Sequence, residues 1–485
     1  MTEATQPFCS LIGGQWVAAA SGRSFEIRNP ADTRDLVGRF AACEAVDAQA
    51  AVAAAQAAFD GWRRTPISKR ARILNDAAAH LEQHVERNAQ ELTREEGKLI
   101  ALSRDEVLRA AQTLRFYAVE GQSWTGETFP QDDPAMTVST QREPLGVVTV
   151  ITPWNFPISI PARKIAPALI TGNTVVFKPA SIAPLSGLRL AEALHQAGLP
   201  PGVLNFITGS AAAVGPSITE AKAIRAITFT GSTAAGEHIH RSVPFTTRTQ
   251  MELGGKNPLI VMDDADLDQA VDLAIKGGLS LTGQACTGTS RLLVMKSVKA
   301  EFTTKLLAHM AKLVIGNGMT TGVDIGPLAS AQQLDSVLGH IAAGKAEATL
   351  LCGGERLAGP EHEHGHFVSP ALFADVSSSM HIAREEVFGP VLALIEVDSY
   401  RDAIAQANDT PYGLAAAIAT RNPRLMHDFA NDIEAGTVKI NRTTTGNLIN
   451  APFGGLKRSS TATFRESGRS GLEFFTQTKT VYRGC

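Results

Sequence analysis

The sequence predicts an α/β protein with two parallel β-sheets, each covered by helices on both faces. Short runs of β-branched residues alternate with helical segments, which is typical of consecutive β-α-β units. In the first half, the expected strands are 146–151, 174–178, 203–207 and 226–230. The alternation begins again after Glu252, with expected strands at 259–262 and 291–295. The chain has 485 residues, whereas one hydrophobic core organises roughly 250–300, so two large domains are expected.

Helices are expected before and between these strands. Residues 46–60 are rich in alanine, and residues 67–119 combine charged faces with regularly spaced apolar positions, so both ranges are predicted to be helical. Shorter helices are expected at 162–171, 184–197, 266–280 and 299–313.

Charge and cysteine content exclude several classes of protein. The chain carries 45 Lys and Arg against 48 Asp and Glu, a formal charge of −3, which predicts no basic surface for nucleic acid or a membrane. No apolar run reaches the roughly 18 residues of a membrane span. The five cysteines are scattered and form no C-x-x-C pair, which fits a reducing cytoplasm and indicates neither a disulfide framework nor a zinc site. We expect a cytoplasmic protein that binds no metal.

One cysteine, Cys286, lies in the polar sequence Gly-Gln-Ala-Cys-Thr-Gly-Thr-Ser of residues 283–290. Cysteine is more often a small buried apolar residue, and that interpretation suffices for the other four. In a loop beside a predicted helix end, however, backbone amides and the helix dipole favour a thiolate. Cys286 is therefore a candidate nucleophile.

Glu252 and Asn155 add two groups that carbonyl chemistry needs beside a thiol. Glu252 ends an apolar run and is followed closely by two glycines, so its carboxylate is expected at a tight turn, where it can activate the thiol or a water. Asn155 lies in Thr-Pro-Trp-Asn-Phe-Pro, residues 152–157, directly after a strand. Its side-chain NH₂ is the kind of donor that stabilises an oxyanion. A lone glutamate is usually only a surface charge, so the set of three carries the hypothesis.

Two segments are candidates for binding a nucleotide. The turn Thr-Gly-Ser-Thr-Ala-Ala-Gly, residues 230–236, follows a predicted strand and precedes a helix, so Gly231 and Ser232 can approach a phosphate. The usual G-x-G-x-x-G pattern is absent, and a corner that simply prefers glycine is the commoner case. Lys178 ends a strand. It is either a solvated lysine or a cation for ribose or phosphate at the carboxyl edge of the sheet.

These motifs, together and in this order, resemble those of the aldehyde dehydrogenase superfamily, and the resemblance extends over about residues 11–482. The motifs are Thr152-Pro-Trp-Asn-Phe-Pro, Phe229-Thr-Gly-Ser-Thr, Met251-Glu-Leu-Gly-Gly-Lys, Gly283-Gln-x-Cys, Glu385-Glu-Val-Phe-Gly-Pro and Pro452-Phe-Gly-Gly. Each is moderately specific, and jointly they leave little room for chance. The resemblance implies oxidation of an aldehyde to a carboxylic acid with NAD⁺ or NADP⁺, through a cysteine thiohemiacetal and a thioester.

The resemblance also implies a role for each matching position. Cys286 attacks the aldehyde, Asn155 and the Cys286 backbone N–H hold the oxyanion, and Glu252 activates the hydrolytic water. Lys178 binds the adenosine ribose, and Glu386 binds the nicotinamide ribose. The full set expected to contact the cofactor is Trp154, Lys178, Ser181, Gly231, Ser232, Leu253, Glu386 and Phe388.

The implied architecture is aldehyde dehydrogenase-like, with two Rossmann-like domains and a β-hairpin. Residues 1–122 and 142–252 form the NAD(P)-binding domain, and residues 253–450 form the catalytic domain with the nucleophilic cysteine. Residues 123–141 and 451–485 form the oligomerisation element. Tail residues 479–482 are expected to add a strand to a neighbouring subunit, in a homodimer or homotetramer.

The chain departs from the family pattern in two places. Many NAD-specific relatives carry glutamate three residues after the lysine that corresponds to Lys178, where it repels a 2′-phosphate. Ser181 stands there in this chain, so we expect NADP⁺ to be used well, even preferentially. Residues 457–466 stand where many relatives have a glycine-rich run, and these residues make the backbone less permissive there.

Two arginines suggest a substrate with a distal acid. Arg163 is similar in position to an arginine that binds the distal carboxylate in succinate-semialdehyde dehydrogenases, and Arg442 lies on a loop expected to close the tunnel. A second arginine of those enzymes is not matched, because Ser280 stands there. Phe156 is a further candidate for substrate contact. Guanidinium groups bind carboxylates in a bidentate manner, which favours succinate or 2-oxoglutarate semialdehyde. That both arginines are structural ion-pair partners remains open.

Three alternative functions are also considered. The same mechanism serves a neutral aliphatic or aromatic aldehyde. A CoA-acylating semialdehyde dehydrogenase uses the same thiol, but such relatives typically lack the hydrolytic glutamate that this chain has in Glu252. A non-catalytic binding protein of the same fold is disfavoured because Cys286, Glu252 and Asn155 are all intact.

Overall fold

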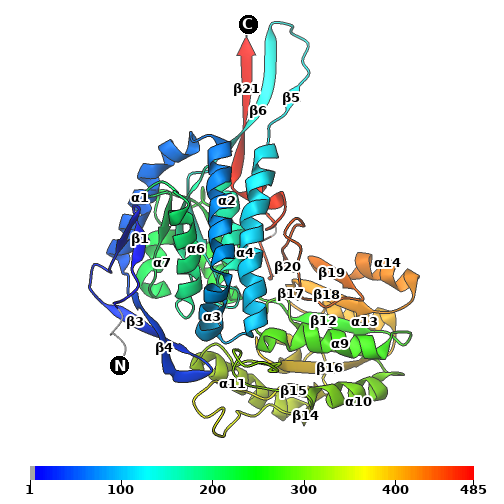
Figure 1. The fold of residues 1–485 in the computed structure, drawn as a ribbon. Coiled ribbons are helices and arrows are strands. Elements are labelled where there is room, and N and C mark those ends of the chain that lie inside the picture. The colour runs from blue at the N-terminus through cyan, green and yellow to red at the C-terminus, as the bar shows by residue number, and fades with distance from the viewer. Residues whose placement is uncertain (1–5, 462, 485) are drawn as a thin grey trace.

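Two seven-stranded sheets form the two halves of the molecule, and a narrow three-stranded sheet projects from the first half (Figure 1). The computed structural model describes residues 6–461 and 463–484. The first sheet lies in the blue-to-green half of the chain, and the second lies in the green-to-orange half. The predicted α/β class with two mainly parallel sheets is confirmed.

The first sheet is parallel over five neighbouring strands. Its order is β11 (Arg248–Glu252), β10 (Ile224–Thr230), β7 (Val147–Ile151), β8 (Thr174–Lys178), β9 (Leu204–Phe206), β1 (Ser10–Ile12) and β2 (Gln15–Val17). Strands β1 and β2 are antiparallel additions at one side. Ile151 is in register with Lys178, and Thr230 with Glu252, so the parallel strands end at one common edge. The loops that follow them therefore start close together.

Helices cover both faces of this sheet because successive strand residues are apolar and point to opposite sides. Val148, Val150 and Phe177 belong to the larger core, and Val147 and Val176 belong to a second core on the opposite face. The larger core includes residues of α2 (Ile67–Gln83), α3 (Val85–Glu96), α4 (Ile100–Glu120), α5 (Ser159–Ile170) and α6 (Pro184–Gln196). The second includes residues of α1 (Ala45–Arg63) and α7 (Ala211–Thr219). Helix α8 (Thr233–Ser242) follows β10.

The range 67–119, which the sequence analysis treats as helical throughout, contains three helices separated by two breaks. α2 ends at Gln83 and α3 begins at Val85. Gly97 then ends α3 with a φ of 98°, a left-handed conformation that glycine adopts without a steric penalty. Lys98 follows this break and is only 3% exposed. The break therefore places a buried lysine between two helices.

The second sheet is parallel except at one edge strand. Its order is β14 (Thr349–Cys352), β15 (Ala371–Ala374), β16 (Val391–Val397), β13 (Thr289–Met295), β12 (Asn257–Val261), β18 (Ala415–Ala419) and β19 (Thr437–Ile440). β14 is the antiparallel strand. Residues of α9 (Leu267–Gly278) and α10 (Lys299–Met310) form one of its cores. Residues of α11 (Ala331–Glu347), α12 (His381–Arg384), α13 (Tyr400–Asn408) and α14 (Pro423–Asp432) form the other.

The two sheets are joined so that opposite ends of their strands meet. β11 ends at Glu252, and residues 253–256 lead directly into β12, which begins at Asn257. The carboxyl edge of the first sheet therefore faces the amino edge of the second. Cys286 lies just before β13, at that amino edge. The topology thus brings the loops after β7 and β11 to the loop that carries the cysteine.

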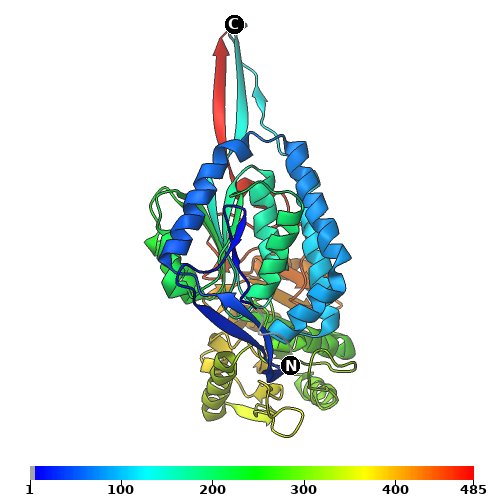
Figure 2. The same cartoon turned by 60° about the vertical axis from the view of Figure 1, so that its left-hand side comes forward.

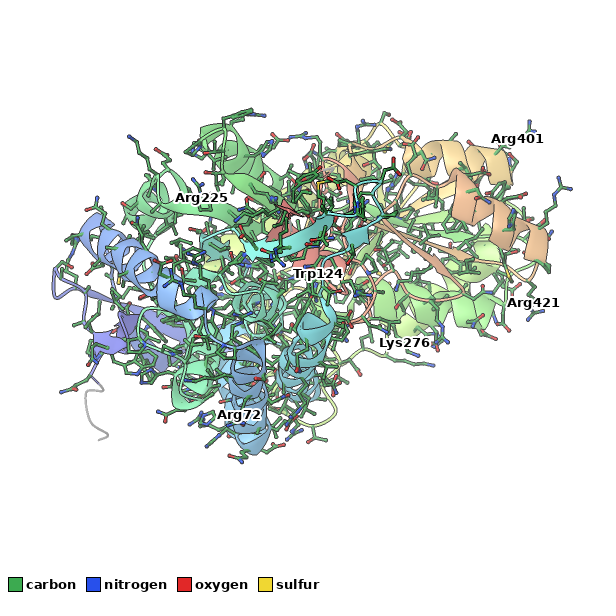
Figure 3. All side chains as sticks on the ribbon, turned by 90° about the horizontal axis from the view of Figure 1, so that it is seen from above. Arg72, Trp124, Arg225, Lys276, Arg401 and Arg421 are labelled. Atoms are coloured by element: carbon green, nitrogen blue, oxygen red, sulfur yellow. The ribbon has the colours of Figure 1, made fainter. Side chains whose placement is uncertain are left out.

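The projecting sheet consists of β5 (Thr128–Phe129), β6 (Met136–Pro144) and β21 (Thr476–Gly484) (Figures 1 and 2). At its base, Trp124 donates a hydrogen bond from Nε1 to Thr476 Oγ1 (3.1 Å), and the Arg142 guanidinium lies 4.7 Å from the Trp124 ring centroid. Figure 3 shows Trp124 at this position, seen from above. β21, expected to join a neighbouring subunit, pairs with β6 of its own chain, so its strand pairing is already satisfied on one side.

Smaller elements complete the fold. β3 (Ser24–Asn29) and β4 (Asp32–Ala41) form a hairpin, β17 (Tyr412–Gly413) pairs with β20 (Leu456–Lys457), and α15 (Ser470–Phe474) precedes β21. Arg72, Arg401 and Arg421 point outward at the periphery (Figure 3). None of the helices that the structure describes is long and apolar enough to cross a membrane.

Candidate active site

Two cavities meet at Cys286. The first, here called the arginine cavity, is lined by residues that include Arg109, Phe156, Arg163, Glu252, Phe453 and Glu466. The second, here called the tryptophan cavity, is lined by residues that include Trp154, Asn155, Gly231, Ser232, Glu386 and Phe388. Cys286, Thr230 and Leu253 line both. A ligand in either cavity therefore reaches the same thiol.

The loop before Cys286 has an unusual backbone. Leu281 and Thr282 have φ values of 54° and 57°, and Gly283 has a φ of 69°. A Cβ atom at Gly283 would lie 2.1 Å from the Gly389 carbonyl oxygen, so only glycine fits. After the cysteine, Asn257 Nδ2 donates to the Cys286 carbonyl at 2.8 Å. The backbone is therefore held on both sides of the thiol.

The surroundings of Cys286 favour a protonated thiol. Its side chain is partly accessible because it lines both cavities, yet protein encloses it deeply. Burial, together with the nearby carboxyl groups of Glu386 and Glu252, raises the pKa of Cys286 to about 12, although Arg163 acts in the opposite direction. The residues at hand do not create a standing thiolate, so a base has to take the proton during the reaction.

The side-chain amide of Asn155 uses one of its two hydrogens for a hydrogen bond within the protein. The residue is 2% exposed, and its Nδ2 donates to the Gln284 carbonyl at 2.8 Å. A side-chain NH₂ has two hydrogens, so the second is available to an oxyanion. Lys98 Nζ donates to the Asn155 carbonyl at 2.6 Å, which fixes the backbone of the loop.

A buried ion pair stabilises the loop that carries Asn155. Lys98 Nζ lies 2.5 Å from Glu106 Oε2, and both side chains are almost fully enclosed. Glu106 Oε1 accepts hydrogen bonds from the backbone N–H groups of Ile158 (3.1 Å) and Ser159 (3.2 Å). The Lys98 ammonium also lies 4.6 Å from the centroid of the Phe156 ring. Residues 155–159 are thereby tied to helix α4.

Glu252 is a buried carboxyl group with one free oxygen. It is 2% exposed, and its Oε1 accepts a hydrogen bond from Ser460 Oγ at 3.1 Å. Oε2 has no hydrogen-bond partner among the described residues. Burial and the neighbouring Glu466 raise the pKa of Glu252 well above its usual value, and Lys164 opposes them. Glu252 is therefore a neutral acid at low pH and a base only once the pH passes this raised value.

Lys164 and Glu466 form a second buried pair beside Glu252, which sequence reasoning missed. Lys164 Nζ pairs with Glu466 Oε1 and donates to Thr228 Oγ1 at 2.8 Å. Burial lowers the pKa of Lys164, while Glu466 raises it. A signal for it is present in the sequence, because Ser159, Arg163 and Lys164 are the only polar residues of the otherwise apolar helix α5. A lysine on such a helix has to have a partner inside the protein.

The tryptophan cavity holds two aromatic rings and a carboxyl group. The rings of Trp154 and Phe388 meet edge to face, with centroids 5.4 Å apart. The backbone N–H of Gly255 donates to Glu386 Oε1 at 2.9 Å, and burial raises the pKa of Glu386 to about 7. A Cβ atom at Gly254 would lie 2.2 Å from Glu386 Oε2, so the glycine leaves room for this carboxyl group.

The predicted phosphate turn also lines the tryptophan cavity. Ser232 is the N-cap of α8, and its Oγ accepts a hydrogen bond from the Ala235 N–H at 3.4 Å. Thr230 Oγ1 is buried and has no partner among the described residues. A Cβ atom at Gly231 would lie 2.6 Å from the Phe229 ring. An open helix N-terminus with an unused hydroxyl beside it fits an anionic group.

Lys178 and Ser181 lie at the same carboxyl edge. Lys178 is 5% exposed, and its Nζ donates to the Pro179 carbonyl at 3.1 Å. Burial lowers the pKa of Lys178 to about 8, and no carboxylate oxygen of the described residues lies within 4.0 Å of it. Ser181 Oγ donates to the Gly209 carbonyl at 2.9 Å. A buried cation without a counter-ion, an open helix N-terminus and a cavity with two aromatic rings fit a dinucleotide.

Of the residues predicted to contact substrate, two line the arginine cavity and one does not. Phe156 and Arg163 line the arginine cavity. Arg163 Nη1 lies 3.7 Å from Glu466 Oε2, so this arginine also has the structural ion-pair role that the sequence analysis left open. Arg442 is exposed and does not line the cavity. Thr445, Gly446 and Asn447 of its loop line it instead. The structure therefore brings the expected loop to the cavity but leaves the Arg442 side chain outside its lining.

No group of three or more His, Cys, Asp and Glu side chains within residues 6–461 and 463–484 is arranged to hold a metal ion.

Comparison with known proteins identifies the family. The pattern of the aldehyde dehydrogenase family matches residues 16–481. The alpha-ketoglutaric semialdehyde dehydrogenase of Bacillus subtilis is 43% identical over 98% of each chain, and the alpha-ketoglutarate semialdehyde dehydrogenase of Haloferax volcanii is 43% identical over 99% of each. A solved structure described as an E. coli NADP-dependent enzyme is 37% identical, with a TM-score of 0.94 over 99% of this chain and 98% of its own. The chain belongs to the aldehyde dehydrogenase family.

The segment that departs from the family pattern, residues 457–466, contributes directly to this aldehyde dehydrogenase site. It supplies Ser460, which binds Glu252, and Glu466, which pairs with Arg163 and Lys164. Gln250 Nε2 donates to the Arg465 carbonyl at 3.1 Å. The less permissive sequence therefore folds against the first sheet and brings a carboxylate to the arginine cavity.

The environment of Cys286 predicts a steep pH dependence of its reactivity in the cofactor-free protein. The thiolate is the reactive form, and its fraction rises about tenfold per pH unit as long as the pH stays below the pKa. Alkylation of Cys286 by iodoacetamide, followed by peptide mass mapping, should therefore accelerate continuously from pH 7 to pH 10. Glutathione in the same tube is the control, because its rate levels off near an ordinary thiol pKa. A plateau of the Cys286 rate below pH 8 would contradict the raised pKa.

Proposed function

We propose that this aldehyde dehydrogenase oxidises a carboxylate-bearing semialdehyde, 2-oxoglutarate or succinate semialdehyde, to the dicarboxylic acid with NAD⁺ or NADP⁺. One observation carries the proposal: Cys286 lies between a cavity that fits a dinucleotide and a cavity lined by guanidinium groups. The names of the two relatives from Bacillus subtilis and Haloferax volcanii support the substrate class.

The first half of the reaction requires a nucleophile, a base and an oxyanion donor. Cys286 Sγ attacks the aldehyde carbon, and its proton passes to Glu252, which lines the same cavity and has a free oxygen. The free amide hydrogen of Asn155 and the backbone N–H of Cys286 stabilise the oxyanion of the thiohemiacetal. When bound, the nicotinamide supplies the hydride acceptor, and the thiohemiacetal becomes a thioester on Cys286.

The second half requires a base for water. Glu252 first releases to solvent the proton that it took from Cys286. It then removes a proton from the water that attacks the thioester and returns this proton to the Cys286 sulfur, which leaves as a thiolate while the acid forms. The buried pair of Lys164 and Glu466 sets the charge around this base, because Glu466 raises its pKa and Lys164 lowers it. Trp154 and Phe388 line the tryptophan cavity and would pack against the nicotinamide, and Glu386 would accept hydrogen bonds from its ribose.

The substrate class is tested with a panel of aldehydes. We expect kcat/KM for 2-oxoglutarate semialdehyde and succinate semialdehyde to exceed that for pentanal and benzaldehyde at least tenfold, because only the semialdehydes form charge-assisted hydrogen bonds with a guanidinium group. Steady-state NAD(P)H formation measures each rate. Equal values across the panel would favour a neutral aldehyde, and turnover that continues only when CoA is added would favour the acylating reaction.

The role of Glu252 is tested with Glu252→Gln. In this variant a solvent base has to deprotonate Cys286 in place of Glu252. The variant should then release at most one equivalent of NAD(P)H and stall as a thioester on Cys286. Stopped-flow absorbance and intact-protein mass spectrometry measure the burst and the adduct. In the wild type, deacylation should accelerate with rising pH, because a raised pKa leaves Glu252 protonated at low pH. Steady turnover by the variant would remove Glu252 from deacylation.

The cofactor preference is tested with Ser181→Glu. We propose that NADP⁺ is used at least as well as NAD⁺, because position 181, three residues after the buried Lys178, carries a neutral hydroxyl that does not repel a 2′-phosphate. A carboxylate at position 181 should raise KM for NADP⁺ about tenfold or more through repulsion of the 2′-phosphate, with little change for NAD⁺. Ser181→Gln is the uncharged control. A wild-type kcat/KM for NAD⁺ far above that for NADP⁺ would contradict the proposal.

We also propose that the chain forms a homodimer or homotetramer in the cytoplasm, with residues 123–141 and the C-terminal strand as the contact. The projecting sheet supports this, because β21 has an outer edge without a strand partner among the described residues. The domain ranges 1–122 with 142–252, and 253–450, follow the two sheets. Within 451–485, Ser460 and Glu466 contact the first sheet and only β21 belongs to the projecting sheet.

A further inference from the structure

Arg109 is a half-buried arginine of helix α4 that lines the arginine cavity. It also lines a smaller adjoining pocket, together with Arg163, Tyr117, Leu448 and others, but without Cys286. Arg109 therefore lies on the side of the arginine cavity that points away from the thiol. A distal group of a substrate bound to Cys286 extends toward this side.

Arg109 differs from Arg163 in its partners. Arg163 lies 3.7 Å from Glu466, and its guanidinium lies 5.3 Å from the Phe453 ring. No carboxylate oxygen within the described ranges lies within 4.0 Å of the Arg109 guanidinium, and no side-chain hydrogen bond from Arg109 occurs there. Its neighbours on α4 are different, because Arg104 pairs with Glu86 and Arg115 pairs with Glu82. Arg109 is therefore a cation with unused donors.

The charges around the arginine cavity do not balance. Arg109, Arg163 and Lys164 contribute three positive charges, and Glu466 contributes one negative charge. Glu252 is neutral below its raised pKa. Arg163 lowers the pKa of Arg109 further than burial alone does, which shows that the two guanidinium groups repel each other. A half-buried guanidinium group without a counter-ion favours binding of an anion from outside the chain.

We propose that Arg109 is the specificity-determining residue that binds the distal carboxylate of the substrate, and that Arg163 is held by Glu466 and assists it. The inference rests on the proposed function, because it requires an acid-bearing aldehyde. It differs from the sequence-based hypothesis, in which Arg163 and Arg442 bind the acid. The N–H groups of Arg109 can donate to both oxygens of a carboxylate in bidentate geometry, whereas Arg163 already shares its charge with Glu466.

The test compares Arg109→Leu and Arg109→Lys with the wild type on 2-oxoglutarate semialdehyde and on pentanal. Loss of a charge-assisted hydrogen bond predicts that Arg109→Leu raises KM for the semialdehyde about 10- to 100-fold. Its kcat for the semialdehyde and both constants for pentanal should stay within about threefold of wild type. Arg109→Lys should recover part of the loss because it keeps the charge. Arg115→Leu, on the same helix but at the surface, is the matched control and should behave as wild type.

Competitive inhibition of pentanal oxidation adds a readout that does not depend on turnover of the acid-bearing substrate. Glutarate has a second acid where pentanoate has a methyl group, so wild type should be inhibited by glutarate more strongly than by pentanoate. Arg109→Leu should remove that difference. The inference would be overturned if Arg109→Leu lost kcat/KM equally on the semialdehyde and on pentanal. It would also be overturned if Arg163→Leu alone removed the preference for the acid. If wild type itself has no preference for the acid, it is the proposed function that fails.

Discussion

The site depends on the buried ion pair between Lys98 and Glu106. Lys98 follows the break at Gly97 and donates to the Asn155 carbonyl, while Glu106 holds the backbone at Ile158 and Ser159. Each ion satisfies the other and the loop at once, so neither is left buried without a partner. Removing one partner of such a pair costs about 3–5 kcal/mol. The oxyanion donor is thus fixed to helix α4 of the outer helical layer, not only to the strand that precedes it.

The same helix links the two ends of the substrate path. α4 carries Glu106, which positions the Asn155 loop, and Arg109, which lies one turn later and faces the arginine cavity. Residues three apart on a helix lie on one face. One rigid element therefore fixes the distance between the reacting carbonyl and a distal acid. A long helix suits this role. If the two groups were carried by separate loops at the two ends of the cavity, the position of each group would vary independently of the other.

The sequence predicted the two mainly parallel sheets well, because strand patterns are local signals, whereas the roles of Cys286, Glu252 and Asn155 stay predictions. The β-branched run 174–178 coincides with β8, and the motifs around Cys286, Glu252 and Asn155 each state a local backbone requirement. Parallel strands end at one edge, so their loops had to meet. Glu466 and Lys164 were missed because their pairing joins segments far apart in sequence. Arg442 lies outside the cavity lining for a related reason: the loop position is local, but the direction of each side chain on it depends on packing.

Electrostatics around the thiol connect the two cavities. Glu386, on the tryptophan side, raises the pKa of Cys286, whereas Arg163, on the arginine side, lowers it. An acid-bearing substrate neutralises part of the positive charge on the arginine side and so removes some of the stabilisation of a thiolate. A cationic ring of an oxidised nicotinamide in the tryptophan cavity, which Glu386 lines, would supply positive charge on the opposite side of the thiol. The two ligands would then act on the thiol with opposite sign, and a semialdehyde alone would disfavour the thiolate that attacks it. Such an arrangement would couple the reactivity of Cys286 to the presence of the cofactor by charge as well as by hydride transfer.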